Sequence, residues 1–305
     1  MPELVKTADW VAVAGRWEFE NGTATYVGPD PQSKNPYGIA LSAERFRKGT
    51  VQTTVVFGEK ATSSAGRLLF GYNPSTQEYY TVGIGGYSYL YVLDQYLPNL
   101  GWKAIAELGS RDALRPRSQF NIRTRITGQR ASLAVNEVPV LESYLPRPLL
   151  GNQAGLFAWG DDPVEFRNTL FSASKPTVFV VMQFGQPYDS LYTDVIKNVV
   201  EEMGLEAYRA DDVYKSGIIL QDVIRGLTES EIIIAEVSPA NENVFYELGF
   251  AHALGKTTIL LADRSKSLPF DIAGYRVIFY ENTIKGKKEV EHQLREHLKR
   301  ILADE

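Results

Sequence analysis

Residues 177–184 have the sequence TVFVVMQF, a continuous apolar run about as long as one β-strand. A strand that is buried on both faces of a parallel sheet needs such a run, whereas a strand with one solvated face alternates apolar and polar residues. The run follows the segment SASKP at residues 172–176, where an alternating pattern stops. We therefore place a domain boundary there and predict two domains, residues 1–173 and residues 174–305.

Beyond the boundary, short apolar segments alternate with amphipathic segments. Such alternation is typical of a doubly wound, mainly parallel α/β sheet, whose ligands bind outside the carboxyl ends of the strands. We expect strands at residues 178–182, 205–209, 231–237, 257–262 and 276–280, and helices at residues 190–203, 219–230, 244–254 and 288–302.

The first domain has a different periodicity. From Gly15 to about Ala173, segments such as TVQTTVVFG (50–58) and FNIRTRIT (120–127) alternate with period two and are separated by Gly, Pro, Asn and Ser at intervals near ten residues. This pattern predicts an all-β antiparallel sandwich. Hairpin turns are expected around Gly128 and at Asn136-Glu137.

The β-rich half resembles the concanavalin-A-like jelly roll of laminin-G-type and legume-lectin-like domains. The matching features are a first strand with Trp17, the pair GRLLFGY and EYYTVGI, a strand with Trp102, and the closing segment GLFAWGDDPVEFRNTLFSA. The resemblance implies a sensor or scaffold that binds a glycan or a protein. Five aromatic residues could stack on sugars, although large aromatic residues more often form a sandwich core: Tyr72, Tyr87, Tyr89, Trp102 and Trp159.

Composition excludes several kinds of chemistry. The 305 residues include no cysteine, so a disulfide, a cysteine-ligated zinc and a thiol nucleophile are impossible, and no metal site is expected. The net charge of −5 argues against nucleic acid as a partner. Neither a signal peptide nor the run of about eighteen apolar residues that a membrane helix needs is recognisable. We expect a soluble, cytoplasmic protein with no membrane partner.

Polar residues follow the first three predicted strands of the second domain, at residues 183–189, 209–217 and 238–243. Because the carboxyl ends of parallel strands meet at one edge of a sheet, these clusters are expected to converge. Glu247 is expected in the first turn of the following helix, with Asn243 as its N-cap. A glutamate there is also favourable simply through the helix dipole.

Residues 238–256, SPANENVFYELGFAHALGK, are similar to the N-V-x-x-E-x-G-x-A signature of nucleoside 2-deoxyribosyltransferase-like proteins and bacterial TIR-like domains. Further matches are FVVMQF at residues 179–184 and the segment from Arg209 to Asp222. The resemblance covers essentially the whole second domain and implies a flavodoxin-like, TIR-like fold. Two residues depart from the pattern, Gln183 in place of a proline and Glu236 in place of an aspartate.

The resemblance assigns roles to residues of all three polar clusters. It makes Glu247 the catalytic carboxylate that stabilises or attacks the sugar C1′ when an N-glycosidic bond breaks. Asp211 or Asp212 would bind ribose hydroxyls, and Arg209 or Lys215 would bind a phosphate group of the nucleotide. The full set of expected substrate-binding residues is Phe184, Gly185, Tyr188, Arg209, Asp211, Asp212, Ser216, Asn241 and Asn243. Turn formation by the two aspartates, N-capping by Asn243 and simple packing of His252 remain alternatives.

Hydrolysis of NAD+, with NAD+ as substrate and no further cofactor, is the first functional hypothesis. A TIR-like domain fused to a sandwich sensor is typical of bacterial effectors, often in antiviral defence, and such sites are often completed in a homo-oligomer. A deoxyribosyltransferase acting on nucleosides is the second hypothesis. The third is a non-catalytic nucleotide-binding or self-association module joined to a glycan- or protein-binding sandwich.

Overall fold

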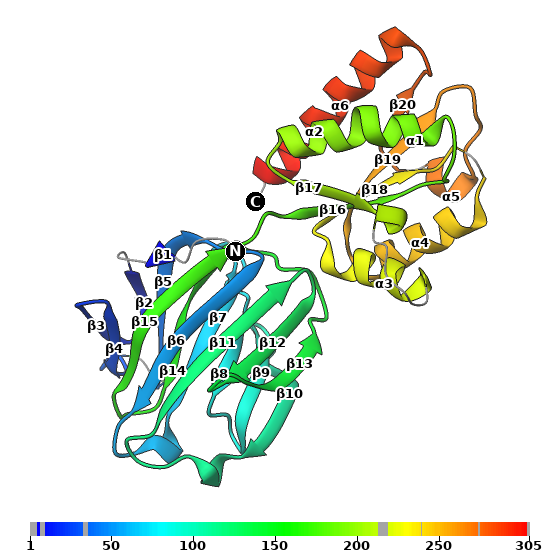
Figure 1. Ribbon diagram of the computed structural model, residues 1–305. Coiled ribbons are helices and arrows are strands. Elements are labelled where there is room, and N and C mark those ends of the chain that lie inside the picture. Colours follow the sequence, from blue (N-terminus) through cyan, green and yellow to red (C-terminus); the bar gives the residue numbers. More distant parts are fainter. Residues whose placement is uncertain are drawn as a thin grey trace. The chain divides into compact units, whose positions relative to one another are not determined.

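The computed structural model describes residues 5–6, 10–32, 36–212, 219–238, 240–273 and 275–303. The chain divides into two compact units, one of residues 1–145 and 149–174 and the other of residues 146–148 and 175–305 (Figure 1). Each unit has its own hydrophobic core. None of the described helices combines the length and the apolar character needed to cross a membrane.

The N-terminal unit is a sandwich of two antiparallel sheets, as predicted. In spatial order, the eight-stranded sheet contains β13 (Val138–Tyr144), β12 (Arg130–Val135), β11 (Gln119–Thr127), β6 (Gly49–Phe57), β15 (Val164–Ala173), β4 (Thr23–Gly28) and β3 (Arg16–Glu20), with β1 (Val5–Lys6) also paired to β15. The seven-stranded sheet contains β10 (Gly101–Ser110), β9 (Tyr89–Leu97), β8 (Tyr79–Ile84), β7 (Ala65–Tyr72), β14 (Gln153–Trp159), β5 (Tyr37–Arg45) and β2 (Trp10–Ala14).

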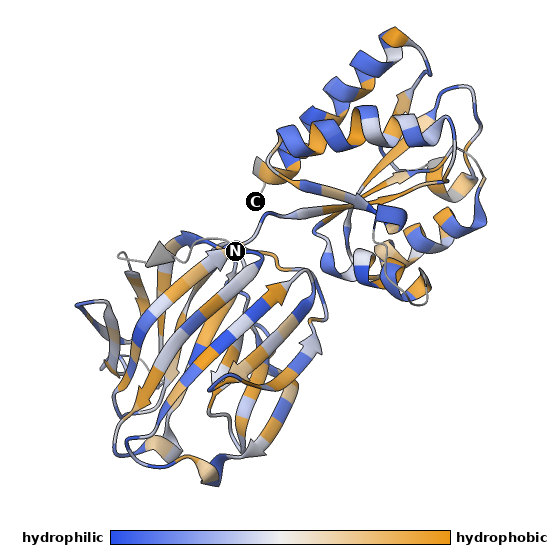
Figure 2. Ribbon diagram, viewed as in Figure 1, coloured by the Kyte–Doolittle hydropathy of each residue, from blue (hydrophilic) through white to orange (hydrophobic). Residues whose placement is uncertain are grey.

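Alternation along the strands builds the core between the two sheets. Along β6, buried residues alternate with half-buried ones over the whole strand, and the alternating colours of such strands are visible in Figure 2. Both expected hairpins are confirmed. Thr127 pairs with Arg130 across a two-residue loop, and Asn136 and Glu137 both have positive φ, as a type I′ turn between β12 and β13 requires.

The C-terminal unit has a five-stranded parallel sheet, also as predicted. Its order is β17 (Glu206–Arg209), β16 (Thr177–Val181), β18 (Ile232–Glu236), β19 (Thr257–Asp263) and β20 (Val277–Tyr280). Numbered along the chain this is the order 2-1-3-4-5, the flavodoxin-like arrangement. Every residue of β16 and of β18 is buried, and these strands form the apolar centre of the unit in Figure 2.

Helices cover both faces of this sheet. One face packs against α1 (Tyr188–Leu191), a π-helical turn (Tyr192–Ile196), α2 (Lys197–Glu202) and α6 (Ile284–Ala303). The other face packs against α3 (Ile219–Glu229), α4 (Glu242–Ala253) and the short α5 (Phe270–Ala273), which the sequence pattern did not predict. The doubly wound architecture is therefore confirmed (Figure 1).

Gly226 of α3 lies directly against the ring of Phe179 in β16. A Cβ atom at this position would approach the Phe179 ring to 2.5 Å, closer than any real contact. We expect Gly226→Ala to destabilise the C-terminal unit by about 1–3 kcal/mol through overpacking, despite the better helix propensity of alanine. Urea denaturation followed by circular dichroism measures this, since the described α-helices all belong to that unit. Gly249→Ala on α4 is the control, because a Cβ there meets no atom within 4 Å.

Candidate functional site

A cavity of about 280 Å³ opens at the carboxyl ends of β16 and β17, beside the start of α4. β17 and β18 lie on opposite sides of β16, so the strand order reverses at this edge of the sheet. Ligands of doubly wound sheets bind at such a point. Its polar lining is Gln183, Arg209, Asn241, Asn243 and Glu247, and its apolar lining includes Phe179, Met182, Phe184, Leu220 and Val223.

Glu247 places an unpartnered carboxylate in this cavity. The side chain is half-buried, and among the described residues none donates a hydrogen bond to it and none forms an ion pair with it. Burial disfavours the charged form and raises the pKa of Glu247 to about 7. A carboxyl group with a shifted pKa, in a cavity and without a structural partner, is a candidate for chemistry.

The N-terminus of α4 differs from the expectation. The helix begins at Glu242 and its N-cap is Asn241, whose Oδ1 accepts hydrogen bonds from the backbone N–H groups of Asn243 (3.0 Å) and Val244 (3.4 Å). The prediction that Asn243 caps the helix was therefore wrong, and Glu247 lies in the second turn rather than the first. Because the dipole acts mainly within the first turn, it gives a weaker structural reason for a glutamate at this position.

We expect Asn241→Ala to destabilise the C-terminal unit by about 1 kcal/mol, because the substitution removes the cap of α4. Urea denaturation followed by circular dichroism measures the loss. Asn243→Ala is the matched control, since Asn243 lines the same cavity but caps nothing. An equal loss of stability in both variants would contradict the assignment of the cap.

Arg209 lies under Phe184 and is neutralised by two carboxylates. Its guanidinium forms a bidentate pair with Asp211 (2.7 and 2.6 Å) and a single bond to Asp189 (2.9 Å). The guanidinium carbon lies 4.9 Å from the ring centroid of Phe184, which is itself 53% exposed. Arg209 therefore holds an exposed aromatic ring at the cavity instead of offering a free positive charge.

The remaining predicted site residues that the structure describes do not line the cavity with Glu247. Asp212 accepts hydrogen bonds from the Tyr192 hydroxyl and from the Arg209 N–H, and neither aspartate of the pair Asp211-Asp212 lines the cavity. Tyr188 lines a different cavity of about 500 Å³ with Asp263 and Tyr280. Gly185 donates its N–H to Asp189 (3.2 Å), while Lys215 and Ser216 lie outside the described residues.

Sequence analysis gave no role to several residues that line the cavity. Gln183, noted only as a departure from the motif, accepts a hydrogen bond from Asn241 Nδ2 (3.4 Å) and adds an amide to the cavity. The feature of the sequence that could have identified Gln183 as a site residue is its position just after a buried strand. Glu236 is fully buried, accepts hydrogen bonds from Ser238 and Tyr280, and does not line the cavity. His252 packs on Tyr275, with ring centroids 4.8 Å apart.

No family model matches the chain, and no curated protein matches it. Solved structures are similar to each unit. The sandwich is similar to carbohydrate binding module CBM66 from Bacillus subtilis (18% identity, 53% of this chain, 94% of that chain, TM-score 0.45) and to Bacillus licheniformis beta-glucanase (11%, 56%, 94%, 0.41). The C-terminal unit is similar to the TIR domain of Toll-related Receptor TRR-2 from Hydra magnipapillata (14%, 41%, 97%, 0.34). At these identities the similarity concerns the fold.

Proposed function

We propose that the C-terminal unit cleaves the N-glycosidic bond of a nucleotide, with NAD+ as the substrate and Glu247 as the catalytic carboxylate. The observation that carries the proposal is the half-buried Glu247 carboxyl group, which has no partner among the described residues and faces a cavity at the ligand-binding edge of the sheet. A carboxylate in that position can stabilise or attack a sugar carbon that becomes positive.

In the proposed reaction the bond between the nicotinamide nitrogen and the ribose C1′ breaks, and its electron pair leaves with the nicotinamide. The positive charge then moves to the sugar, where the ionised Glu247 stabilises it. Water adds to C1′ and loses a proton, so the products are nicotinamide, ADP-ribose and a proton. In a covalent version of the same step, Glu247 binds C1′ first and water displaces it.

The other lining residues fit the proposed substrate. The exposed ring of Phe184 can stack on a base, and the amides of Gln183, Asn241 and Asn243 can bind the base or the ribose hydroxyls. A cavity of about 280 Å³ is near the lower end for ligand sites. We therefore propose that it holds the base and its ribose, and that the rest of the dinucleotide lies outside it.

The test is a chromatographic assay of the full chain at high concentration, incubated with NAD+ and, in parallel, with a deoxynucleoside and a second free base. Release of nicotinamide supports the proposal, whereas exchange of the base would assign the unit to deoxyribosyl transfer. Silence on both substrates is the result expected of a unit that only binds, or of one whose activating ligand is absent. High concentration is used because the proposal includes completion of the site in a homo-oligomer.

The sandwich would then act as the sensor that controls this activity. We further propose a role of the whole chain in antiviral defence. This proposal rests only on the combination of a sandwich that acts as sensor with a C-terminal unit that acts as effector. Its test is whether expression of the wild-type chain, but not of a Glu247→Gln chain, limits phage growth in a bacterial host.

A further inference from the structure

The seven-stranded sheet of the sandwich has a second apolar face. Along β14, Leu156 and Ala158 belong to the core between the sheets, whereas Phe157 and Trp159 belong to a separate cluster on the opposite face. The rings of Tyr79, Tyr96 and Trp102 contact one another with centroids 5.0–5.8 Å apart, and the Trp102 ring lies 5.2 Å from that of Phe157. We call it the aromatic face; it comprises Tyr37, Tyr72, Tyr79, Tyr96, Trp102, Phe157 and Trp159 with Ala14, Ile39, Leu41 and Leu69.

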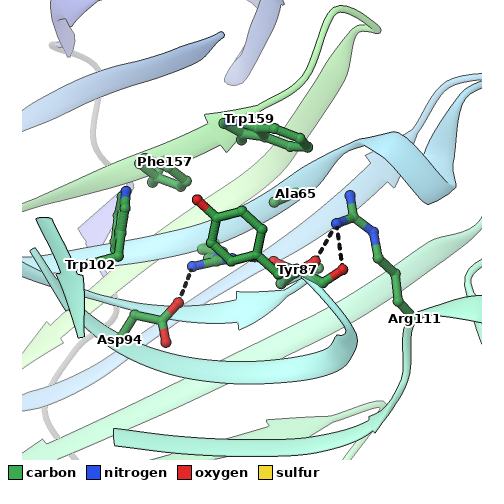
Figure 3. Close-up of a pocket in the computed structure, with 10 residues that line it drawn as sticks. Ala65, Tyr87, Asp94, Trp102, Arg111, Phe157 and Trp159 are labelled. Atoms are coloured by element: carbon green, nitrogen blue, oxygen red, sulfur yellow. Dashed lines mark hydrogen bonds and ion pairs between the residues drawn. The ribbon is translucent and has the colours of Figure 1, made fainter. Parts of the chain in front are cut away.

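The five aromatic residues singled out in the sequence therefore do not form the core between the sheets. Tyr72, Trp102 and Trp159 belong to the aromatic face, while Tyr87 and Tyr89 are 81% and 41% exposed. A small pocket of about 40 Å³ is hollowed into this face. In Figure 3 the ring of Trp102 lies to the left and that of Trp159 at the top, the ring of Tyr87 lies between them in the centre of the view, and the carboxyl group of Asp94 lies below.

A buried ion pair forms the polar part of the pocket. Arg67 and Asp94 are only 6% and 9% exposed, and Arg67 Nη1 lies 2.7 Å from Asp94 Oδ2. Arg67 also donates to the Thr81 hydroxyl (3.3 Å) and to the Gly85 carbonyl (2.8 Å). The second oxygen of Asp94, Oδ1, accepts no hydrogen bond from the described residues. A buried carboxylate thus keeps a free acceptor at a pocket that it lines.

Of the charged residues that line the pocket, Arg111 alone has no ion-pair partner among the described residues. Arg67 and Asp94 compensate each other, and Arg111 donates to the carbonyls of Gly86, Tyr87 and Ser64 while it lies 5.5 Å from the ring of Trp159. A free acceptor between flat aromatic rings suits a ligand with hydroxyl groups on its edge and C–H groups on its face. Sugars have this combination.

We propose that this pocket of the aromatic face binds one ring of a neutral glycan. Trp102 and Trp159 contact the faces of the ring, Asp94 Oδ1 accepts a hydrogen bond from a sugar hydroxyl, and the exposed Tyr87 covers the ring from the loop between β8 and β9. The pocket has room for about three water molecules, which matches the two or three hydroxyl groups along one edge of a sugar. This proposal is independent of catalysis by the C-terminal unit.

The test is a screen of the full chain against an array of neutral oligosaccharides (glucans, fructans, galactans, mannans and xylans) together with acidic ones, followed by calorimetric titration of the bound glycan. We expect saturable binding of a neutral glycan, weakened about tenfold or more by Tyr87→Ala and by Trp159→Ala. Tyr87 is so exposed that its removal leaves the fold intact. Tyr144→Ala on β13 of the other sheet, where the tyrosine is 56% exposed, is the matched control and should bind like the wild type.

Three results would overturn the proposal. They are no binding to any neutral glycan, binding confined to acidic glycans, and binding that both Tyr87→Ala and Trp159→Ala leave unchanged. Loss of glycan binding with retained nicotinamide release would separate this site from the proposed catalytic one.

Discussion

Glu247→Gln lowers kcat/KM for nicotinamide release from NAD+ by roughly a thousandfold, a loss typical of removing one well-placed electrostatic group. Glutamine has the same shape and can fill the same half-buried position, but it carries no negative charge to meet the positive charge that develops at C1′. It also cannot form a covalent bond to the sugar. The measurement is the rate of nicotinamide release by chromatography at pH 8, where Glu247 is mainly ionised.

The matched control for this prediction is Glu242→Gln. It makes the same substitution five residues earlier on the same helix, at an exposed position that does not line the cavity. We expect its rate to equal that of the wild type. Nicotinamide release by Glu247→Gln at the wild-type rate would remove Glu247 from the mechanism and leave the cavity without a candidate carboxylate among the described residues.

The sequence correctly predicted whether most elements are strands or helices, because each hydrophobic pattern had a single structural explanation. The apolar run of β16 is explained by a strand buried on both faces, and positive φ at Asn136 and Glu137 is explained by a type I′ turn. The start of α4 was misplaced because two asparagines, Asn241 and Asn243, both suit an N-cap. Only the hydrogen bonds from the N–H groups of Asn243 and Val244 to the Asn241 side chain show that Asn241 is the cap.

The aromatic face was missed for a related reason. Every residue of β7 and of β8 is buried, so both faces of these strands are apolar and alternation does not show which face meets the other sheet. Sequence reasoning left two interpretations of these aromatic residues open, stacking on sugars and a single sandwich core, and favoured the core. The structure has two apolar clusters on opposite faces of the same sheet.

At the candidate site, sequence reasoning correctly grouped residues that lie at or just after the ends of strands, or in the first two turns of α4 and at its N-cap. Phe184, Arg209, Asn241, Asn243 and Glu247 all line one cavity. Tyr188 does not, because it begins α1, and α1 packs on the opposite sheet face from α4. The pairing of Arg209 with Asp189 and Asp211 depends on side-chain geometry, which the positions of charged residues along the chain do not reveal.

We also expect Glu247→Gln to raise the free energy of unfolding of the C-terminal unit at alkaline pH. The size of the gain follows from the raised pKa of Glu247. Burial raises the pKa of Glu247 from 4.5 to about 7, so between these values the folded state keeps a proton that the unfolded state releases. The stability contributed by this proton is present below pH 4.5 and is lost as the pH rises through about 7. Glutamine avoids this loss. The expected gain is on the order of 2–3 kcal/mol at pH 8 and under about 1 kcal/mol at pH 5.

Urea denaturation at the two pH values measures this gain, and circular dichroism is the suitable signal. All four tryptophans (Trp10, Trp17, Trp102 and Trp159) belong to the sandwich, so their fluorescence does not report on the unit that contains Glu247. Glu242→Gln on the same helix should show no gain at pH 8. A stability cost of the ionised glutamate would point to a role for its charge outside the fold, because glutamine would serve the fold better at this position. If Glu247→Gln loses the same stability at both pH values, the carboxylate serves the fold and the assignment of catalysis to it fails.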